Sequence, residues 1–130
     1  MIVFTVGVYD LMHVGHVKLF ERAKALGDKL IVAVQSTDCI LKYKPEAQIV
    51  NTQEERVYMV SSIKYVDEVI FYEDVDSIVQ QVDFDIFVMG GDQVHDGFKR
   101  AEQWCRDNGK QVVRLPRTPN ISSTEIRSLK

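Results

Sequence analysis

Two histidines that flank a valine and a glycine form the stretch best suited to chemistry, His13-Val14-Gly15-His16. This stretch follows an apolar run, Ile2 to Gly7, that predicts a β-strand, and it leads into an amphipathic pattern that predicts a helix over 17–26. A helix amino terminus offers unpaired backbone N–H groups and partial positive charge. Gly15 would let an anion approach that backbone, and two imidazoles would add directed donors. The pattern therefore indicates a polyphosphate site, the alternative being two unrelated polar residues at a turn.

A second pattern suited to phosphate lies near the carboxyl terminus. Ser122-Ser123-Thr124-Glu125 has the spacing of a capping box and predicts the start of a short helix. Its N–H groups and hydroxyls could receive phosphate oxygens, and Arg117 adds a planar fork of donors. A simple N-cap is the alternative interpretation, but a cap needs one hydroxyl and this segment offers three.

Other ways of handling nucleotides and phosphates lack support in the sequence. No Gly-x-Gly-x-x-Gly follows the first predicted strand and no Gly-x4-Gly-Lys-Ser/Thr occurs, which disfavours dinucleotide and P-loop interpretations. A metal-dependent hydrolase could be drawn from His13, His16, Asp92 and His95, but their spacing differs from that of helical zinc sites such as His-Glu-x-x-His. We therefore predict no metal ligands in the protein and place His95 in a loop.

These candidate residues must be positioned by strands that alternate with helices. Strands are predicted over 2–7, 30–34, 69–71, 86–89 and 112–115. Helices are predicted over 17–26, from the Thr52-x-x-Glu55 capping box, from Asp76 to Val82, over 98–108, and from Ser122, with a polar loop after the second strand. The fold class is α/β, a Rossmann-like three-layer sandwich with a central five-stranded parallel sheet, in a single domain over 1–130. Ligands of such sheets bind beyond the carboxyl ends of the strands.

Composition sets outer limits on function. The 130 residues are 45% hydrophobic and 27% charged, with a net charge of -3, so no basic stripe suggests a nucleic-acid partner. The first apolar run is too short for a signal peptide or a membrane span, which predicts a cytoplasmic protein without a membrane partner. Cys39 and Cys105 match neither a CxxC motif nor a disulfide scaffold, so we expect free thiols.

The chain resembles the cytidylyltransferases of the HxGH nucleotidyltransferase superfamily. The resemblance spans nearly the whole sequence and rests on five segments in matching order: Asp10 with His13–His16, Glu54-Glu55-Arg56, Tyr65–Val69, Val88–Asp92 and Arg117–Thr124. It implies an enzyme that uses CTP to attach a cytidylyl group to a phosphorylated small molecule and releases pyrophosphate. It also implies Mg2+ bound mainly through substrate phosphates, and a homodimer.

The resemblance assigns roles to individual residues. As catalytic residues it implies His13, His16, Lys44 and Arg117. As nucleotide-binding residues it implies Val8, Tyr9, Asp10, His13, Gly15, His16, Asp92, Arg117, Thr118, Ile121, Ser122, Ser123 and Thr124. As acceptor-binding residues it implies Lys42, Lys44, Arg56 and His95. The two lysines would lie in a mobile loop that closes over substrate, the alternative being an ordinary solvated loop.

Departures from the family pattern leave the substrates open. Val8 replaces a threonine that often follows the first glycine in the family, so one possible hydroxyl contact to the nucleotide is missing, and Gly-Gly-Asp, here Gly90-Gly91-Asp92, also occurs in related heptose-phosphate adenylyltransferases. Acidic residues over 73–76 stand where glycerol-phosphate members tend to carry a lysine, which favours an acceptor with an amine or other donors. An adenylyltransferase acting on a sugar phosphate is the main alternative, and a non-catalytic nucleotide-binding module is a further one.

Overall fold

Five parallel strands form one sheet in the computed structural model, which describes residues 1–91 and 93–116. The strands are β1 (Ile2–Gly7), β2 (Lys29–Gln35), β3 (Glu68–Tyr72), β4 (Ile86–Gly90) and β5 (Gln111–Leu115). The helices are α1 (Val14–Lys24), α2 (Thr37–Tyr43), α3 (Gln53–Ser61), α4 (Val75–Ile78) and α5 (Asp96–Asp107). The strand order is β3-β2-β1-β4-β5, and every neighbouring pair is parallel.

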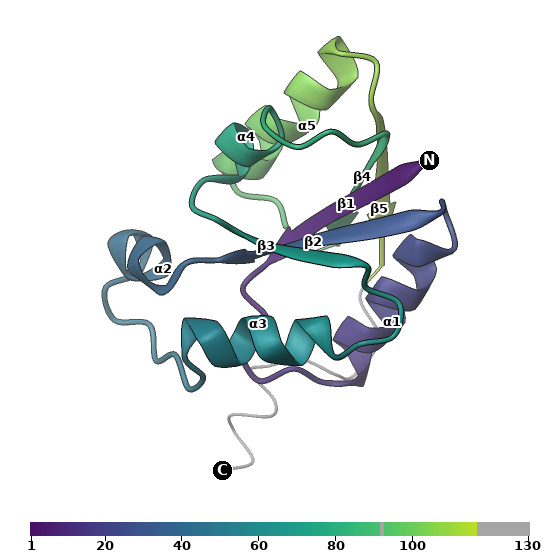
Figure 1. The fold of residues 1–130 in the computed structure, drawn as a ribbon. Helices are drawn as coiled ribbons and strands as arrows, with labels where there is room; N and C mark the ends of the chain where they lie inside the picture. The colour runs from purple at the N-terminus through teal and green to yellow at the C-terminus, as the bar shows by residue number, and fades with distance from the viewer. Residues whose placement is uncertain (92, 117–130) are drawn as a thin grey trace.

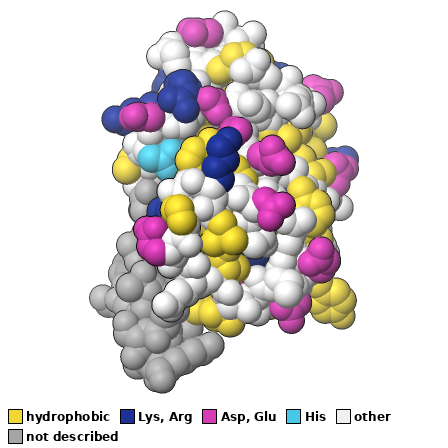
Figure 2. All heavy atoms as spheres, turned by 90° about the vertical axis from the view of Figure 1, so that its left-hand side faces the viewer, with side chains coloured by type: hydrophobic (Ala, Val, Ile, Leu, Met, Phe, Trp, Pro, Cys, Tyr) yellow, Lys and Arg dark blue, Asp and Glu magenta, His cyan; other side chains and the backbone are white. Residues whose placement is uncertain are grey.

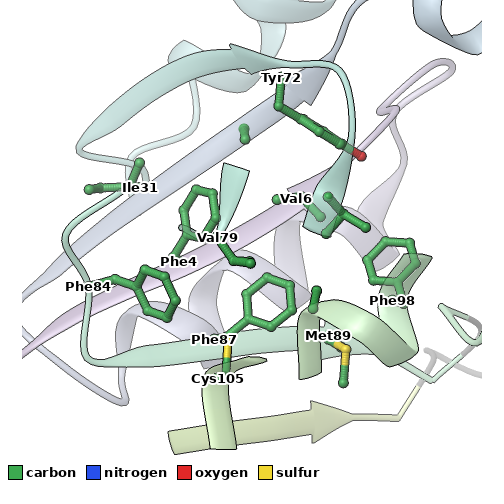
Figure 3. Close-up of a cluster of buried hydrophobic side chains, with 13 residues drawn as sticks. Phe4, Val6, Ile31, Tyr72, Val79, Phe84, Phe87, Met89, Phe98 and Cys105 are labelled. Carbon is green, nitrogen blue, oxygen red and sulfur yellow. The ribbon is translucent and has the colours of Figure 1, made fainter. Parts of the chain in front are cut away.

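Helices cover both faces of this sheet. On one face α1 and α3 pack through Phe20, Ala23 and Val60 against inward-facing strand residues (Figure 1). On the other face α4 and α5 pack against the sheet in a second buried cluster (Figure 3). The helices contribute Val75, Phe98, Ala101 and Cys105, and the strands contribute Phe4, Phe87 and Met89. Within the same cluster the ring of Phe4 stacks on that of Phe84. The predicted Rossmann-like three-layer sandwich with a five-stranded parallel sheet is confirmed for the described residues. The sequence could predict it because strands buried on both faces are nearly continuously apolar.

Several predicted boundaries need correction. Helix α1 begins three residues earlier than the predicted 17–26, because His13 caps it, a role more often taken by Ser, Thr, Asp or Asn. Helix α5 begins at Asp96 for the same reason, with His95 as its cap. Asp76 does not cap α4: Asp74 holds that position and makes no side-chain cap bond. The Thr52–Glu55 capping box of α3 is confirmed, with both reciprocal bonds present.

The polar loop predicted after β2 contains a helix. Ser36 accepts a hydrogen bond from the backbone N–H of Cys39 and thereby caps α2. Lys42 lies in the last turn of α2 and Lys44 is its C-cap residue, so neither sits in a simple loop. Both described cysteines are free and buried, as expected. None of the helices within the described part of the chain is long and apolar enough to cross a membrane.

Candidate functional site at the carboxyl ends of the strands

Strands β1 and β4 mark the point where the order in which strands are added to the sheet reverses. From β1 the chain moves outward through β2 to β3, then crosses back to β4 and β5 on the other side. Pairing of β1 with β4 ends at Thr5 and Val88, whereas pairing of β1 with β2 continues to Gly7 and Val34. The carboxyl ends of β1 and β4 therefore separate, which is where open α/β sheets bind ligands. Seen from this side, Lys, Arg, acidic and histidine side chains share the surface with hydrophobic ones (Figure 2).

The two histidines of the His-x-Gly-His stretch cap α1 reciprocally. His13 Nδ1 accepts the backbone N–H of Gly15 at 3.0 Å, and His16 Nδ1 accepts the backbone N–H of His13 at 3.2 Å. Their rings lie 4.1 Å apart between centroids. A nitrogen that accepts a hydrogen bond carries no proton, so each neutral ring is protonated at Nε2, on the side away from its backbone partner. The caps thus set both imidazoles as Nε2–H donors.

The first turn of α1 differs from that of every other described helix in its charge. It contains no acidic residue, whereas the first turns of the other helices carry Asp38, Glu54 and Glu55, Asp76, and Asp96. Carboxylates in a first turn are stabilised by the helix dipole and neutralise its positive end. The amino terminus of α1 has no such carboxylate of its own and therefore suits an external anion. It follows β1 after the loop over 8–13, so the helix start lies after the first strand, where the sequence placed it.

The loop between β1 and α1 is held in a conformation that costs free energy. Tyr9 and Leu11 have φ values of 57° and 50°, the only left-handed non-glycine residues among those described. The Tyr9 ring is buried, packs near His16 and Phe20, and lies so close to Gly7 that a Cβ there would be 2.6 Å from the ring. Burial raises the pKa of Tyr9, so its hydroxyl stays protonated. The packing of the Tyr9 ring therefore anchors the loop to Gly7 and α1.

Asp10 and Arg56 join this loop to neighbouring elements. The buried Asp10 carboxylate accepts the backbone N–H groups of Val50 and Asn51 at 2.8 and 2.9 Å. Arg56 is fully buried, and its guanidinium donates to the carbonyls of Val8 and Gln35 at 2.9 and 2.8 Å and to the Thr37 hydroxyl. Burial lowers the pKa of Arg56, and the charge of Asp10 opposes that shift.

These contacts bear on the acceptor role implied for Arg56, which stays a prediction. The guanidinium is buried, and it donates to the ends of β1 and β2 and to the start of α2. Its placement also lets Arg56 position the loop after β1. The carbonyl of Val8 is one of its partners, and the Asp10 carboxylate holds the segment before α3. The nucleotide contacts implied for Val8 and Asp10 remain predictions.

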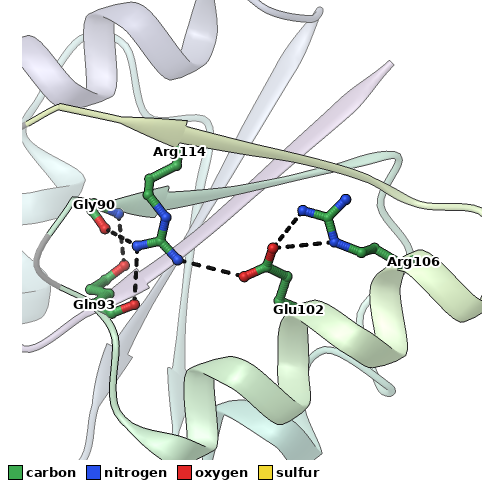
Figure 4. Close-up of polar contacts among 5 residues, drawn as sticks. All are labelled: Gly90, Gln93, Glu102, Arg106 and Arg114. Carbon is green, nitrogen blue, oxygen red and sulfur yellow. Dashed lines mark hydrogen bonds and ion pairs between the residues drawn. The ribbon is translucent and has the colours of Figure 1, made fainter.

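Two polar residues, Gln93 after β4 and Arg114 in β5, were not predicted as site residues from the sequence. Gln93 links the separated strands: its Nε2 donates to the Val6 carbonyl and its Oε1 accepts the Gly90 N–H, both at 2.9 Å. Arg114 of β5 donates to the Gly90 and Gln93 carbonyls at 3.0 and 3.2 Å (Figure 4). The Gly-Gly turn at the end of an apolar strand was the one local signal that could have drawn attention to Gln93.

The remaining acceptor-site predictions lie around α2 and α5. Lys42 and Lys44 are exposed at the carboxyl-terminal end of α2, and between them the Tyr43 hydroxyl donates to Asp74. This hydrogen bond raises the pKa of Tyr43 to about 12. His95 is exposed and caps α5, with its Nδ1 accepting the Gly97 N–H at 3.2 Å. These contacts leave the acceptor role of the lysines and His95 untested.

Part of the predicted site falls outside the described residues. This applies to Asp92, Arg117, Thr118, Ile121, Ser122, Ser123 and Thr124. Within residues 1–91 and 93–116, no three His, Cys, Asp or Glu side chains are grouped so that they could hold a metal ion.

A parallel α/β sheet whose strands separate at their carboxyl ends, beside a helix start without first-turn acidic residues, places the protein in the Rossmann-like class and is an arrangement that suits a phosphate ligand. The chain matches the family model described as Cytidylyltransferase-like over residues 4–129. It therefore belongs to the cytidylyltransferase-like family of nucleotidyltransferases.

Individual relatives agree with this placement. The chain is 39% identical to glycerol-3-phosphate cytidylyltransferase of Bacillus subtilis (strain 168), over 96% of this chain and 93% of the relative. It is 36% identical to bifunctional protein HldE of a Nitratiruptor species, over 96% of this chain but only 26% of that longer protein. Among solved structures, the lipopolysaccharide core biosynthesis protein of Thermoplasma volcanium GSS1 superposes with a TM-score of 0.73 at 26% identity, covering 91% of this chain and 96% of that one.

Proposed function

We propose that the protein is a cytidylyltransferase that transfers CMP from CTP to a phosphorylated small molecule and releases pyrophosphate. The observation that carries this proposal is the amino terminus of α1 at the strand reversal, with no acidic side chain in its first turn and with His13 and His16 set as Nε2–H donors. Such a site suits a triphosphate. Full-length similarity to glycerol-3-phosphate cytidylyltransferases supports CTP as the nucleotide.

In this reaction the chain positions reactants and stabilises charge. An oxygen of the acceptor phosphate forms a bond to the α-phosphorus of CTP, the bond from that phosphorus to the β-phosphate oxygen breaks, and pyrophosphate leaves in line. The α1 amides and the two imidazoles would hold the triphosphate and offset the charge that develops on the leaving group. No covalent enzyme intermediate is required, so the protein needs no serine or cysteine nucleophile.

Mg2+ would add charge neutralisation and would be held through the phosphates. This ion dehydrates reluctantly and in such sites binds through one or two carboxylates plus substrate phosphates. The described carboxylate nearest the α1 turn in sequence, Asp10, accepts two backbone N–H groups. The protein's contribution to the ion is therefore proposed to be small.

The acceptor is proposed to be a polyol, amino-alcohol or related phosphate. Of the acidic residues that distinguish the 73–76 segment, Asp76 is paired with Arg100 at 2.8 Å, whereas Asp74 accepts a hydrogen bond from the hydroxyl of Tyr43. A carboxylate beyond β3 whose partner is a hydroxyl rather than a cation favours an acceptor that carries a donor or an amine besides its phosphate. The contact of any acceptor with Asp74 is part of this proposal.

An acceptor screen with each nucleotide tests the proposal. Purified protein is incubated with CTP, ATP, GTP or UTP, Mg2+ and a panel of polyol, amino-alcohol, amino-acid and sugar phosphates, and pyrophosphate release is measured. We expect release with CTP, and a product whose mass equals the acceptor plus CMP minus water. ATP-dependent release without CTP-dependent release would favour an adenylyltransferase, the alternative suggested by the Gly90-Gly91-Asp92 sequence. Release with glycerol 3-phosphate above all other acceptors would contradict the prediction, drawn from the acidic 73–76 segment, that the acceptor is not glycerol 3-phosphate.

The homodimer implied by the resemblance and the cytoplasmic location expected from the short first apolar run remain predictions. Sedimentation equilibrium of the full chain would measure the first, with a mass of twice 14.9 kDa expected. Fractionation of the cells that make the protein would measure the second.

A further inference from the structure

The side chain of Gln93 takes the place of direct backbone hydrogen bonding between the ends of β1 and β4. Strands β1 and β4 are paired only as far as Thr5 and Val88. Beyond that point the Val6 carbonyl and the Gly90 N–H are joined through one side-chain amide, whose Nε2 donates to the former and whose Oε1 accepts from the latter. Gln93 thus lets the two strands separate without leaving either backbone group unsatisfied. Its partner Val6 is 87 residues away in the chain.

Arg114 holds the turn that carries Gln93. The Gly90 carbonyl accepts the Gln93 N–H at 3.2 Å, which closes a turn between these two residues, and it also accepts from Arg114 Nη1 at 3.0 Å. The same Nη1 donates to the Gln93 carbonyl at 3.2 Å, while Nη2 lies 3.5 Å from a carboxylate oxygen of Glu102 in α5 (Figure 4). One planar guanidinium therefore fixes the turn from the side of β5.

We propose that Gln93 and Arg114 are positioning residues for the nucleotide: together they hold open, at fixed width, the gap between β1 and β4 over which the triphosphate lies. This inference rests on the proposed function. Its physical basis is that a bound phosphate must meet donors placed to within a few tenths of an ångström, which a slack strand end would not provide. Gln93 sets the separation of the two strands and Arg114 sets the orientation of the turn.

The test compares substitutions that keep size but remove hydrogen bonds. Gln93→Met should raise the KM for the nucleotide about tenfold, and Arg114→Met about threefold, with the KM for the acceptor within about twofold of wild type. Arg114→Lys, which can still donate to one carbonyl, should recover part of the loss. Arg106→Met is the matched control, because Arg106 binds the same Glu102 but does not reach the turn. It should behave as wild type.

Different failures of this experiment have different meanings. An unchanged nucleotide KM in both Met variants would overturn the positioning role, and so would an equal loss in kcat with no change in KM, which signifies only less folded protein. Gln93→Glu covers the case in which Gln93→Met does not fold, because it keeps the acceptor oxygen but loses the donor to Val6. If no acceptor is turned over, equilibrium titration with CTP replaces the kinetics. Wild-type protein that binds no nucleotide would defeat the proposed function itself.

Discussion

Helices α1 and α5 begin with the same kind of cap but differ in the charge of their first turns. Each follows a strand at the sheet reversal, and each is capped by a histidine whose Nδ1 accepts the N–H of a glycine two residues on, in His13-Val14-Gly15 and His95-Asp96-Gly97. The middle residue differs: Val14 brings no charge to the start of α1, whereas Asp96 neutralises the helix dipole of α5. The proposed anion site at α1 therefore differs from the start of α5 in having no first-turn carboxylate.

The loops before the two helices differ in the same sense. The one before α1 contains two left-handed residues, Tyr9 and Leu11, whereas the described residues before α5 have none. Strain of this kind costs about 1–3 kcal/mol for each residue and persists where the surroundings impose it. Buried partners impose it here, through the Tyr9 ring and the Asp10 carboxylate. The α1 start is thus held more rigidly than local propensity would hold it.

Removing the imidazole of His16 should produce the largest effect. We expect His16→Ala to lower kcat/KM by about 100-fold or more, because one preorganised donor to developing charge is lost. The measurement is pyrophosphate release under saturating acceptor. The equivalent change at α5, His95→Ala, should cost less than about tenfold if that helix does not bind the triphosphate. A similar loss in both variants would contradict the distinction between the two helix starts.

His13→Asn separates the capping role of the first histidine from phosphate binding. Asparagine is a good N-cap, so the free energy of unfolding should change by less than about 1 kcal/mol. Activity should still fall, because the Nε2–H donor is gone. Preserved activity would mean that His13 acts only as a cap.

A methyl group at Gly7 should test the rigidity of the α1 loop. Its Cβ would lie 2.6 Å from the Tyr9 ring, so we expect Gly7→Ala to reduce the free energy of unfolding by about 1–3 kcal/mol, as overpacking does. Gly97→Ala is the matched change at α5. There the nearest atom to the new Cβ is a carbon of the His95 ring at 3.0 Å, and the His95 side chain is exposed and can move aside. Urea unfolding of both variants gives the comparison. Equal stability losses would argue against a specially constrained α1 loop.

Val14→Asp converts the start of α1 into the His-Asp-Gly pattern of α5. Val14 is 50% exposed, so the substitution should fold, and the new carboxylate should leave stability unchanged or raise it by about 0.3–1 kcal/mol through the helix dipole. The same carboxylate should weaken nucleotide binding by about tenfold because it repels phosphate. Isothermal titration with CTP and thermal unfolding measure the two effects. Unchanged affinity would place the phosphates elsewhere.

The reverse change, Asp96→Val, should have the smallest effect. It removes the first-turn carboxylate of α5 and should cost about 0.3–1 kcal/mol of stability. The nucleotide KM should stay within about twofold of wild type, since α5 is not assigned to the triphosphate. A gain in nucleotide affinity would show that Asp96 opposes an anion already bound near α5.

The parts of the fold that local pattern controls were predictable. Apolar runs predicted all five strands to within one residue at each end, and the Thr52–Glu55 spacing predicted the capping box of α3. Helix α2 was missed because its seven residues contain polar and charged side chains and no clear period, so only contact with the rest of the chain sustains it. The histidine caps were missed because histidine seldom takes that position.

The amino-acid sequence by itself determined an alternating α/β chain with a His-x-Gly-His turn after its first strand, because periodicity and capping depend on residues a few positions apart. Only the tertiary structure decided that β1 and β4 separate, that Gln93 bridges them across 87 residues, and that Arg56 is buried between the ends of β1 and β2. Those facts depend on strand order and register, and a side chain's partner 48 or 87 residues away leaves no trace in local pattern.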